Sequence, residues 1–434
     1  MDLLDAICST PSAQSVAEYS LSLLFRRSYN SLYKGAQARQ LSTESLSHLV
    51  APYLPQPARP FFLLGLDITP CPRVHSFKLE GRECIHRANQ IKGSPQITYG
   101  HQYSEVCMLP ERDSPLSPRW VIPLKEQRVS RQDQEQSGIK QILALLEDEQ
   151  LPFGKDFCVL VGDSAYSTPT FLHALTSDKP DLIVITRVRS NRHIYSPVQQ
   201  MQTNRRGHPV WYEDEFALNN PAGWPKPDQA FSLLTTNSRG RPNRTEVMVW
   251  HNKVMRGSWK SAHLPMHKLP FTLLKIDLYD EQNKGVFKKP LWLIVIGTRR
   301  EELSPATSLE AYHQRPDMEH FFRFTKRQML LTGYQTPVTA HEENWWQLVH
   351  LAYLQLWMAR DLARRCPYPW QRYTPQVAEK TLSPTMVQRS FSGIIRQFGT
   401  PARPPKRRGN SPGRLQGMVL APRKDQFPVH RCRN

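Results

Sequence analysis

The sequence predicts an α/β protein in which a mixed sheet is flanked by helices. Three short apolar runs have the length and composition of buried strands, namely Phe61–Leu66, Phe157–Gly162 and Leu291–Thr298. The stretch Ser130–Glu149, in contrast, repeats its isoleucines and leucines at helical spacing. Hydrophobic residues make up 39% of the chain and charged residues 22%, as in ordinary globular proteins. Strands that alternate with helices in this way predict the fold class.

The part of the chain before the first apolar run is predicted to be helical. Within residues 1–58, apolar residues recur at helical spacing, at Ala17, Leu21, Leu24 and Phe25. The proline-rich stretch Pro52–Pro60 ends this region. After the first strand, Tyr103–Met108 and Trp120–Pro123 are candidates for neighbouring strands.

The second half of the chain repeats the pattern and then interrupts it. A short helix is predicted at Thr168–Leu175 and a buried strand at Asp181–Val188. Residues 190–289 have many turn residues and no long helical period, so they predict a β-rich insertion with strands such as Thr245–Trp250 and Thr272–Leu278. Two long helices are predicted after the third apolar run, at Pro316–Leu331 and Glu342–Arg365.

The charge of the protein indicates a polyanionic partner. The chain has 57 lysines and arginines against 38 acids, a net charge of +19. Each phosphate that a basic side chain neutralises releases condensed counterions, which favours binding of nucleic acid. The seven scattered cysteines contain no CxxC pair, so they predict neither a zinc site nor a disulfide framework. No secretory signal or membrane-spanning run is evident, which favours a cytoplasmic protein.

Three acids occupy informative positions relative to the predicted strands. Asp67 is predicted at the end of the first apolar strand, Asp163 directly follows the second, and Glu319 lies near the start of the helix after the third. Because ligands bind at the carboxyl ends of strands in such sheets, these acids can converge. A carboxylate trio in a basic protein predicts a Mg²⁺ site, since Mg²⁺ prefers oxygen ligands. Two ions, about 3.5–4 Å apart, would serve a displacement at phosphorus.

The helix around Glu319 carries a second pattern. Tyr312, Arg315, Glu319 and Lys326 have the spacing Y-x2-R-x3-E-x6-K. On an ideal helix these four residues fall within an arc of about 60°. We expect Glu319 to bind metal, Arg315 and Lys326 to contact DNA phosphates, and Tyr312 to donate a hydrogen bond to the DNA. Pro316 fits the first helical turn, so Tyr312 is expected in the turn before it.

The ordered set Asp67, Asp163, Glu319 with this signature resembles the insertion-sequence transposases of the DDE type. The resemblance covers about residues 60–365, and the sequence GDSAYS around Asp163 also resembles that family. It implies a ribonuclease-H-like core with a β-rich insertion between the second aspartate and the glutamate. The segments are then a helical N-terminal region (1–58), assigned to DNA-end recognition, and a catalytic core in two parts (59–189 and 290–365). The β-rich insertion (190–289) lies between these parts, and a basic proline-rich tail (366–434) follows them.

The resemblance also implies an activity and partners. It implies that Asp67, Asp163 and Glu319 are the catalytic residues and metal ligands, with Mg²⁺ as cofactor and Mn²⁺ as a substitute. The implied activity is cleavage at insertion-sequence ends and transfer of the 3′-OH ends to target DNA. The implied assembly is a homodimer in a paired-end complex, and the implied location is the cytoplasm of a bacterium, in association with the nucleoid. In relatives an insertion-domain tryptophan stabilises a flipped base, and the candidates here are Trp211, Trp224, Trp250 and Trp259.

Two other functions remain open from the sequence. One is a ribonuclease-H-like nuclease, or a domesticated transposase, that cuts DNA without strand transfer. The other is an inactive DNA-binding protein that retains the core, although the intact acid trio argues against it. The residues 1–58 equally suit a dimerisation unit, and the charged run Lys406–Arg408 suits a phosphate contact.

Overall fold

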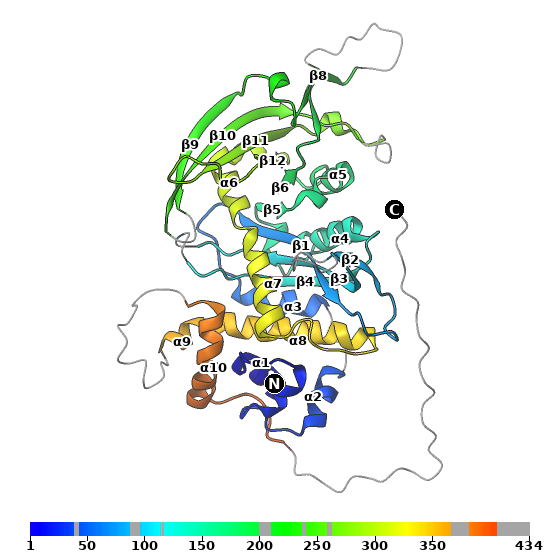
Figure 1. Cartoon of the computed structure of the whole chain (residues 1–434), viewed down its shortest axis with the longest axis vertical. Helices are drawn as coiled ribbons and strands as arrows, with labels where there is room; N and C mark the ends of the chain where they lie inside the picture. Colours follow the sequence, from blue (N-terminus) through cyan, green and yellow to red (C-terminus); the bar gives the residue numbers. More distant parts are fainter. Residues whose placement is uncertain are drawn as a thin grey trace.

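A large mixed sheet runs through the molecule (Figure 1). The computed structural model describes the chain except for residues 39–42, 87–95, 113, 115–116, 199–209, 237–239, 258–262, 366–381 and 406–434. The order of hydrogen-bonded strands in the main sheet is β2 (Glu83–His86), β3 (Ile97–Met108), β1 (Phe62–Pro72), β5 (Cys158–Gly162), β6 (Leu182–Val188), β12 (Leu291–Ile296), β11 (Phe271–Tyr279), β10 (Pro242–Lys253) and β9 (Gln229–Thr236). A further strand, β4 (Ile122–Val129), also pairs with β3. The predicted α/β class is confirmed.

Five of these strands form a ribonuclease-H-like arrangement, in the order β4-β3-β1-β5-β6. β1 is antiparallel to β3, and β3 is antiparallel to β4. On its other side β1 is parallel to β5, and β5 is parallel to β6. Three antiparallel strands therefore continue directly into two parallel ones, as the resemblance implied for the core.

β1 is longer than the sequence predicted, and Asp67 lies inside it rather than at its end. The parallel ladder to β5 stops at Leu66 and Gly162. The antiparallel ladder to β3, however, continues from Leu64 to Pro72. The change from apolar to polar residues after Leu66 therefore marks the loss of one neighbouring strand, because β1 keeps its hydrogen bonds to β3 beyond that point.

Helices cover both faces of the core sheet. Consecutive side chains of a strand point to opposite faces. Gly65 lies against Met318 of α7 (Pro316–Gln328), whereas Leu66 lies against Gly138 of α4 (Gln134–Leu146). α5 (Pro169–Thr176) packs beside α4. The first of the two predicted long helices is α7, preceded by α6 (Pro305–His313), and the second is divided into α8 (Thr339–Met358) and α9 (Arg360–Arg365).

The strands of the insertion extend the main sheet. β9, β10 and β11 form an antiparallel ribbon that joins the core through β12. The predicted runs Thr245–Trp250 and Thr272–Leu278 lie in β10 and β11, so these strand predictions are confirmed. A separate pair consists of β7 (His193–Pro197) and β8 (Tyr212–Ala217).

The N-terminal region consists of short helices, of which α1 (Asp2–Ser9) and α2 (Tyr29–Ala36) lie below α8 in Figure 1. The third, α3 (Thr43–Val50), lies above α8 in that view and packs against β4. The predicted period through Leu21 corresponds to a short 3₁₀ helix, and Leu21 itself is 79% exposed. The 3₁₀ helices of the described chain are Val16–Leu21, Ala51–Tyr53, Pro152–Gly154, Ser164–Tyr166, Pro221–Gly223, Met266–Lys268 and Arg300–Glu302. No helix in the described part of the chain is long and apolar enough to cross a membrane.

A helix that the sequence analysis did not predict lies in the stretch assigned to the tail. α10 (Pro384–Phe398) packs against α1, α8 and α9. It buries Val387, Phe391 and Ile394, which recur at helical spacing, and Ser383 caps its first turn. The run Lys406–Arg408 lies outside the described residues.

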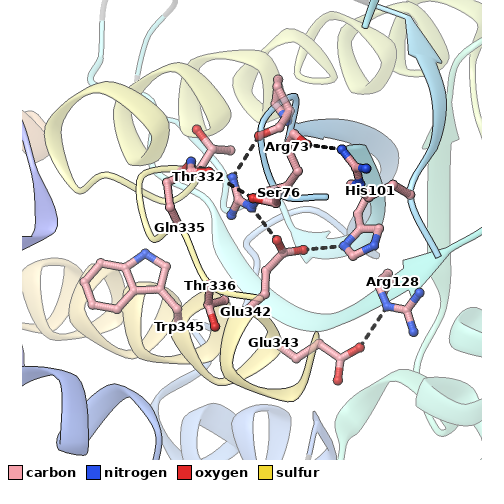
Figure 2. A network of polar contacts seen from close by, with 12 residues as sticks. Arg73, Ser76, His101, Arg128, Thr332, Gln335, Thr336, Glu342, Glu343 and Trp345 are labelled. Atoms are coloured by element: carbon pink, nitrogen blue, oxygen red, sulfur yellow. Dashed lines mark hydrogen bonds and ion pairs between the residues drawn. The ribbon is translucent and has the colours of Figure 1, made fainter. Parts of the chain in front are cut away.

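A buried network of charged side chains joins the end of β1 to α8 (Figure 2). Glu342 in the first turn of α8 accepts hydrogen bonds from Arg73 and Tyr103, and one of its oxygens lies 2.7 Å from His101 Nδ1. The side chains of Arg73 and Glu342 have no exposed surface. Arg73 also donates to the carbonyl of Thr332. Because Arg73 directly follows β1, these bonds fix the strand against α8.

Candidate active site

The pairing of β1 with β5 brings two of the predicted acids together. Leu66 of β1 pairs with Gly162 of β5 in a parallel register, and Asp67 and Asp163 are the residues that follow this pair. Adjacent strands lie about 4.8 Å apart, so the two aspartates begin side by side at the point where the strands separate. The carboxyl group of Asp163 accepts a hydrogen bond from the amide of Ala165 and caps the 3₁₀ turn that follows. Asp163 therefore stays at the sheet edge.

The third predicted acid lies on α7, which crosses this part of the sheet. Gly65 permits the close approach, because a Cβ atom there would lie 2.5 Å from the Met318 sulfur. Arg315 donates to Asp67 Oδ2 and to Glu319 Oε1, each at 2.9 Å. One guanidinium therefore links the acid of β1 to the acid of α7. The Arg315 and Asp67 side chains are each 15% exposed, while Glu319 is 54% exposed.

The electrostatics of Asp67 reflect this crowding of acids. Burial raises the pKa of its carboxyl to about 6; Arg315 opposes the rise, and the charges of Asp163 and Glu319 add to it. Burial alone would lower the pKa of Arg315, but the neighbouring acids outweigh it and raise the value. The site is thus an acidic cluster that requires a compensating cation, and Arg315 supplies one.

The acids suit a divalent cation chemically, but their present arrangement does not enclose one. Aspartate and glutamate oxygens are the ligands that Mg²⁺ prefers. Among the described residues, however, no three acidic, histidine or cysteine side chains converge closely enough to hold an ion. In this arrangement the guanidinium of Arg315 bonds to both Asp67 and Glu319. Metal and guanidinium would compete for the same oxygens.

The other two members of the helical signature lie in α6 and in the last turn of α7. Tyr312 lies in α6, one turn before α7, and is buried. Burial raises the pKa of its phenol, an effect that the charges of Arg315 and Arg187 oppose. Lys326 donates to the backbone carbonyl of Pro70 at 2.7 Å, and burial lowers its pKa to about 8. Lys326 therefore holds the outer half of β1 in this structure.

Two acids near the site were missed in the sequence analysis. Asp317 lies only two residues before Glu319 but is buried and faces Arg112 and Arg119, at 3.3 and 3.5 Å. Glu105 pairs with Asp67 across the β1–β3 ladder and has no exposed surface. An acid within the otherwise apolar end of a strand, as in SEVCML, was the available signal for Glu105.

The environment of Glu105 forms a second polar layer behind Asp67. Glu105 Oε1 accepts from the indole of Trp346 at 2.6 Å and lies 3.1 Å from His350 Nε2. Burial raises the pKa of the neighbouring Glu126 carboxyl to about 7. These side chains come from β3, β4 and α8, so the layer connects the sheet to that helix beneath the candidate site.

The insertion tryptophans that the structure describes pack against other rings of the protein. Trp250 is buried against Trp224 and Trp292, and its indole donates to the carbonyl of Pro225. Trp211 stacks on His267, with ring centroids 4.2 Å apart. Trp259 lies outside the described residues. The contacts of Trp224 and Trp250 are those of core residues.

Comparisons with known proteins place the chain in a family. A structure of piggyBac transposase, solved by cryo-EM as a synaptic complex with hairpin DNA, aligns with 92% of this chain and 72% of its own, at 10% identity. Its TM-score of 0.38 is too low to support an argument. No curated protein matches the sequence. The family model described as DDE superfamily endonuclease matches residues 2–253, which include Asp67 and Asp163 but end before α7. Since this match covers more than half of the 434 residues, the chain belongs to the DDE superfamily endonuclease family.

Proposed function

We propose that this protein is a DNA transposase that cleaves the ends of an insertion sequence and joins the freed 3′-OH ends to target DNA. The observation that carries the proposal is the register of β1 and β5, which sets Asp67 beside Asp163, with Arg315 linking Asp67 to Glu319. The net charge of +19 supports a DNA substrate. Membership of an endonuclease family supports hydrolysis of a phosphodiester.

In this proposal Asp67, Asp163 and Glu319 are the catalytic acids and hold two Mg²⁺ ions, for which Mn²⁺ substitutes. When bound, the ions would supply charge that stabilises the attacking and leaving oxygens. The acids themselves would fix the position of that charge at the sheet edge. Asp163 is oriented for this by its bond to the Ala165 amide.

Arg315 would have two partners during the reaction. Its bonds to Asp67 and Glu319 neutralise the acids before metal binds. With Asp67 and Glu319 as metal ligands, the guanidinium of Arg315 would instead make a bidentate contact to a DNA phosphate. Tyr312 would donate a hydrogen bond from the preceding turn, and Lys326 would add positive charge beside the end of β1. The expected partners are duplex DNA at transposon ends and target, bound by a homodimer in the nucleoid.

A cleavage and joining assay tests this function. Asp67→Asn, Asp163→Asn and Glu319→Gln should each abolish Mg²⁺-dependent cleavage of DNA that carries the sequence flanking the reading frame. Glu310→Gln is the matched control, because Glu310 is an exposed acid on α6 outside the cluster. Full activity in the three variants would exclude the catalytic assignment. With pre-cleaved ends, a joined product supports transposition, whereas cutting without joining identifies a nuclease.

A further inference from the structure

A basic pocket lies next to Asp163, between the segments that follow β5 and β6. It has a volume of about 390 Å³ and is lined by Ser164, Ala165, Ser167, Thr168, Arg189, Asn191 and Arg192. The first four residues belong to the loop after β5, and the last three follow β6. β5 and β6 are parallel neighbours, so both loops leave the sheet at the edge where Asp67 and Asp163 lie. The pocket is therefore a direct neighbour of the candidate active site.

The two arginines of the pocket lack acidic partners. Neither Arg189 nor Arg192 forms an ion pair with any acid in the described ranges of the chain. Arg192 donates one hydrogen bond, to the carbonyl of Ser167 at 3.3 Å. Burial and the nearby charge of Arg189 both lower the pKa of Arg192. Two neighbouring guanidiniums that repel each other form a favourable site for an anion.

The rest of the lining distinguishes a phosphate from a base. None of the described residues that line the pocket is aromatic. A flipped base is normally held by stacking between aromatic or apolar side chains, which this pocket does not offer. The hydroxyls of Ser167 and Thr168 donate to Ser164 and to Glu135, so they shape the loop. The Ser164 hydroxyl and the Asn191 amide remain on the lining to bind phosphate oxygens.

We propose that this pocket binds a backbone phosphate of the cleaved DNA strand, next to the scissile phosphate, through Arg189 and Arg192. The inference rests on the proposed function, since it takes the strand to cross the sheet edge at Asp67 and Asp163. The strand would run from the α7 side, over the acids, to the loops after β5 and β6. The scissile phosphate at the acids and the neighbouring phosphate in the pocket would together fix the register of the strand.

The test measures binding of a mixed-sequence DNA duplex with a single-stranded 3′ overhang, by fluorescence anisotropy without divalent metal and over a range of salt concentrations. Arg189→Ala/Arg192→Ala should weaken binding and reduce the slope of log K against log salt by about 0.7, because one lost single-strand phosphate contact contributes about 0.7. The matched control is Lys155→Ala/Lys179→Ala, which removes the same charge at the opposite ends of β5 and β6. Its slope should remain within a few tenths of wild type.

A second probe localises the contact. With methylphosphonates in place of the overhang phosphates, wild type should lose about 0.7 more of the slope than the arginine variant loses. Equal slopes for both double variants would overturn the pocket, as would an equal loss in wild type and the arginine variant on the neutral overhang. These binding results are separate from the cleavage assay with Asp163→Asn. If the binding tests contradict the pocket while cleavage still depends on metal and on Asp163, the proposed function stands. If the binding tests support the pocket while Asp163→Asn still cleaves DNA, only the catalytic assignment is refuted.

Discussion

Removal of Arg315 should destabilise the metal-free protein and strengthen its response to divalent metal. Arg315 and Asp67 are each 15% exposed, so their pair lies between two limits. Exposed ion pairs contribute about 0–1 kcal/mol, whereas removal of one partner from a fully buried pair costs about 3–5 kcal/mol. The second pair, to Glu319, is more than half exposed on one side and adds little. We expect Arg315→Ala to cost about 2 kcal/mol without metal.

The assay is thermal unfolding with and without Mg²⁺ or Mn²⁺. For a chain of 434 residues, 2 kcal/mol corresponds to a fall in Tm of about 2 °C. Metal that binds only the folded state raises Tm with its concentration. The rise should be larger for Arg315→Ala, because the guanidinium no longer competes for the oxygens of Asp67 and Glu319. Arg323→Ala, an exposed arginine of the same helix, is the control. An equal or smaller metal response in Arg315→Ala would refute the competition.

Three further predictions concern the framework of the site. Glu342→Gln should lower the free energy of unfolding by about 3–5 kcal/mol in urea titrations, because it removes the buried acid of the network in Figure 2; a loss under 1 kcal/mol would contradict this role. Gly65→Ala forces Met318 away from β1, so cleavage should fall severalfold while the protein loses about 1–3 kcal/mol; unchanged cleavage would show that α7 adjusts freely. Burial alone would lower the pKa of His350, but Glu105 outweighs it and raises the value to about 9. The pairing of protonated His350 with Glu105 therefore stabilises the folded state fully below pH 6.5, and this stabilisation is lost as pH rises through 9. The urea concentration at the unfolding midpoint should fall between pH 7 and 10, and it should fall less in Glu105→Gln.

The core strands and the helices of the site followed from local pattern. The apolar runs before Asp67 and Asp163 are buried strands, and the helical period around Glu319 is that of α7. The end of β1 could not be predicted in this way. Its outer half keeps only one neighbouring strand, and a polar strand paired on one side has the same composition as a loop.

The charged contacts were less accessible to prediction. Glu342 and Arg73 are separated by 269 residues in sequence, and nothing local marks either one as buried. The spacing of the signature predicted that Arg315 and Lys326 share a face with Glu319. It did not predict that Arg315 bonds to two acids or that Lys326 bonds to the Pro70 carbonyl. Such partners depend on how α7 crosses β1, which only the tertiary structure defines.

Metal-directed cleavage of the polypeptide tests the central claim most directly, because it reports where a divalent ion binds without requiring DNA or activity. Fe²⁺ in place of Mg²⁺, with peroxide and ascorbate, generates hydroxyl radicals that cut the backbone beside the bound ion. The account predicts cuts near residues 67, 163 and 319, suppressed by excess Mg²⁺ and lost in Asp67→Asn. Cuts confined to other parts of the chain, with these three regions intact, would contradict it.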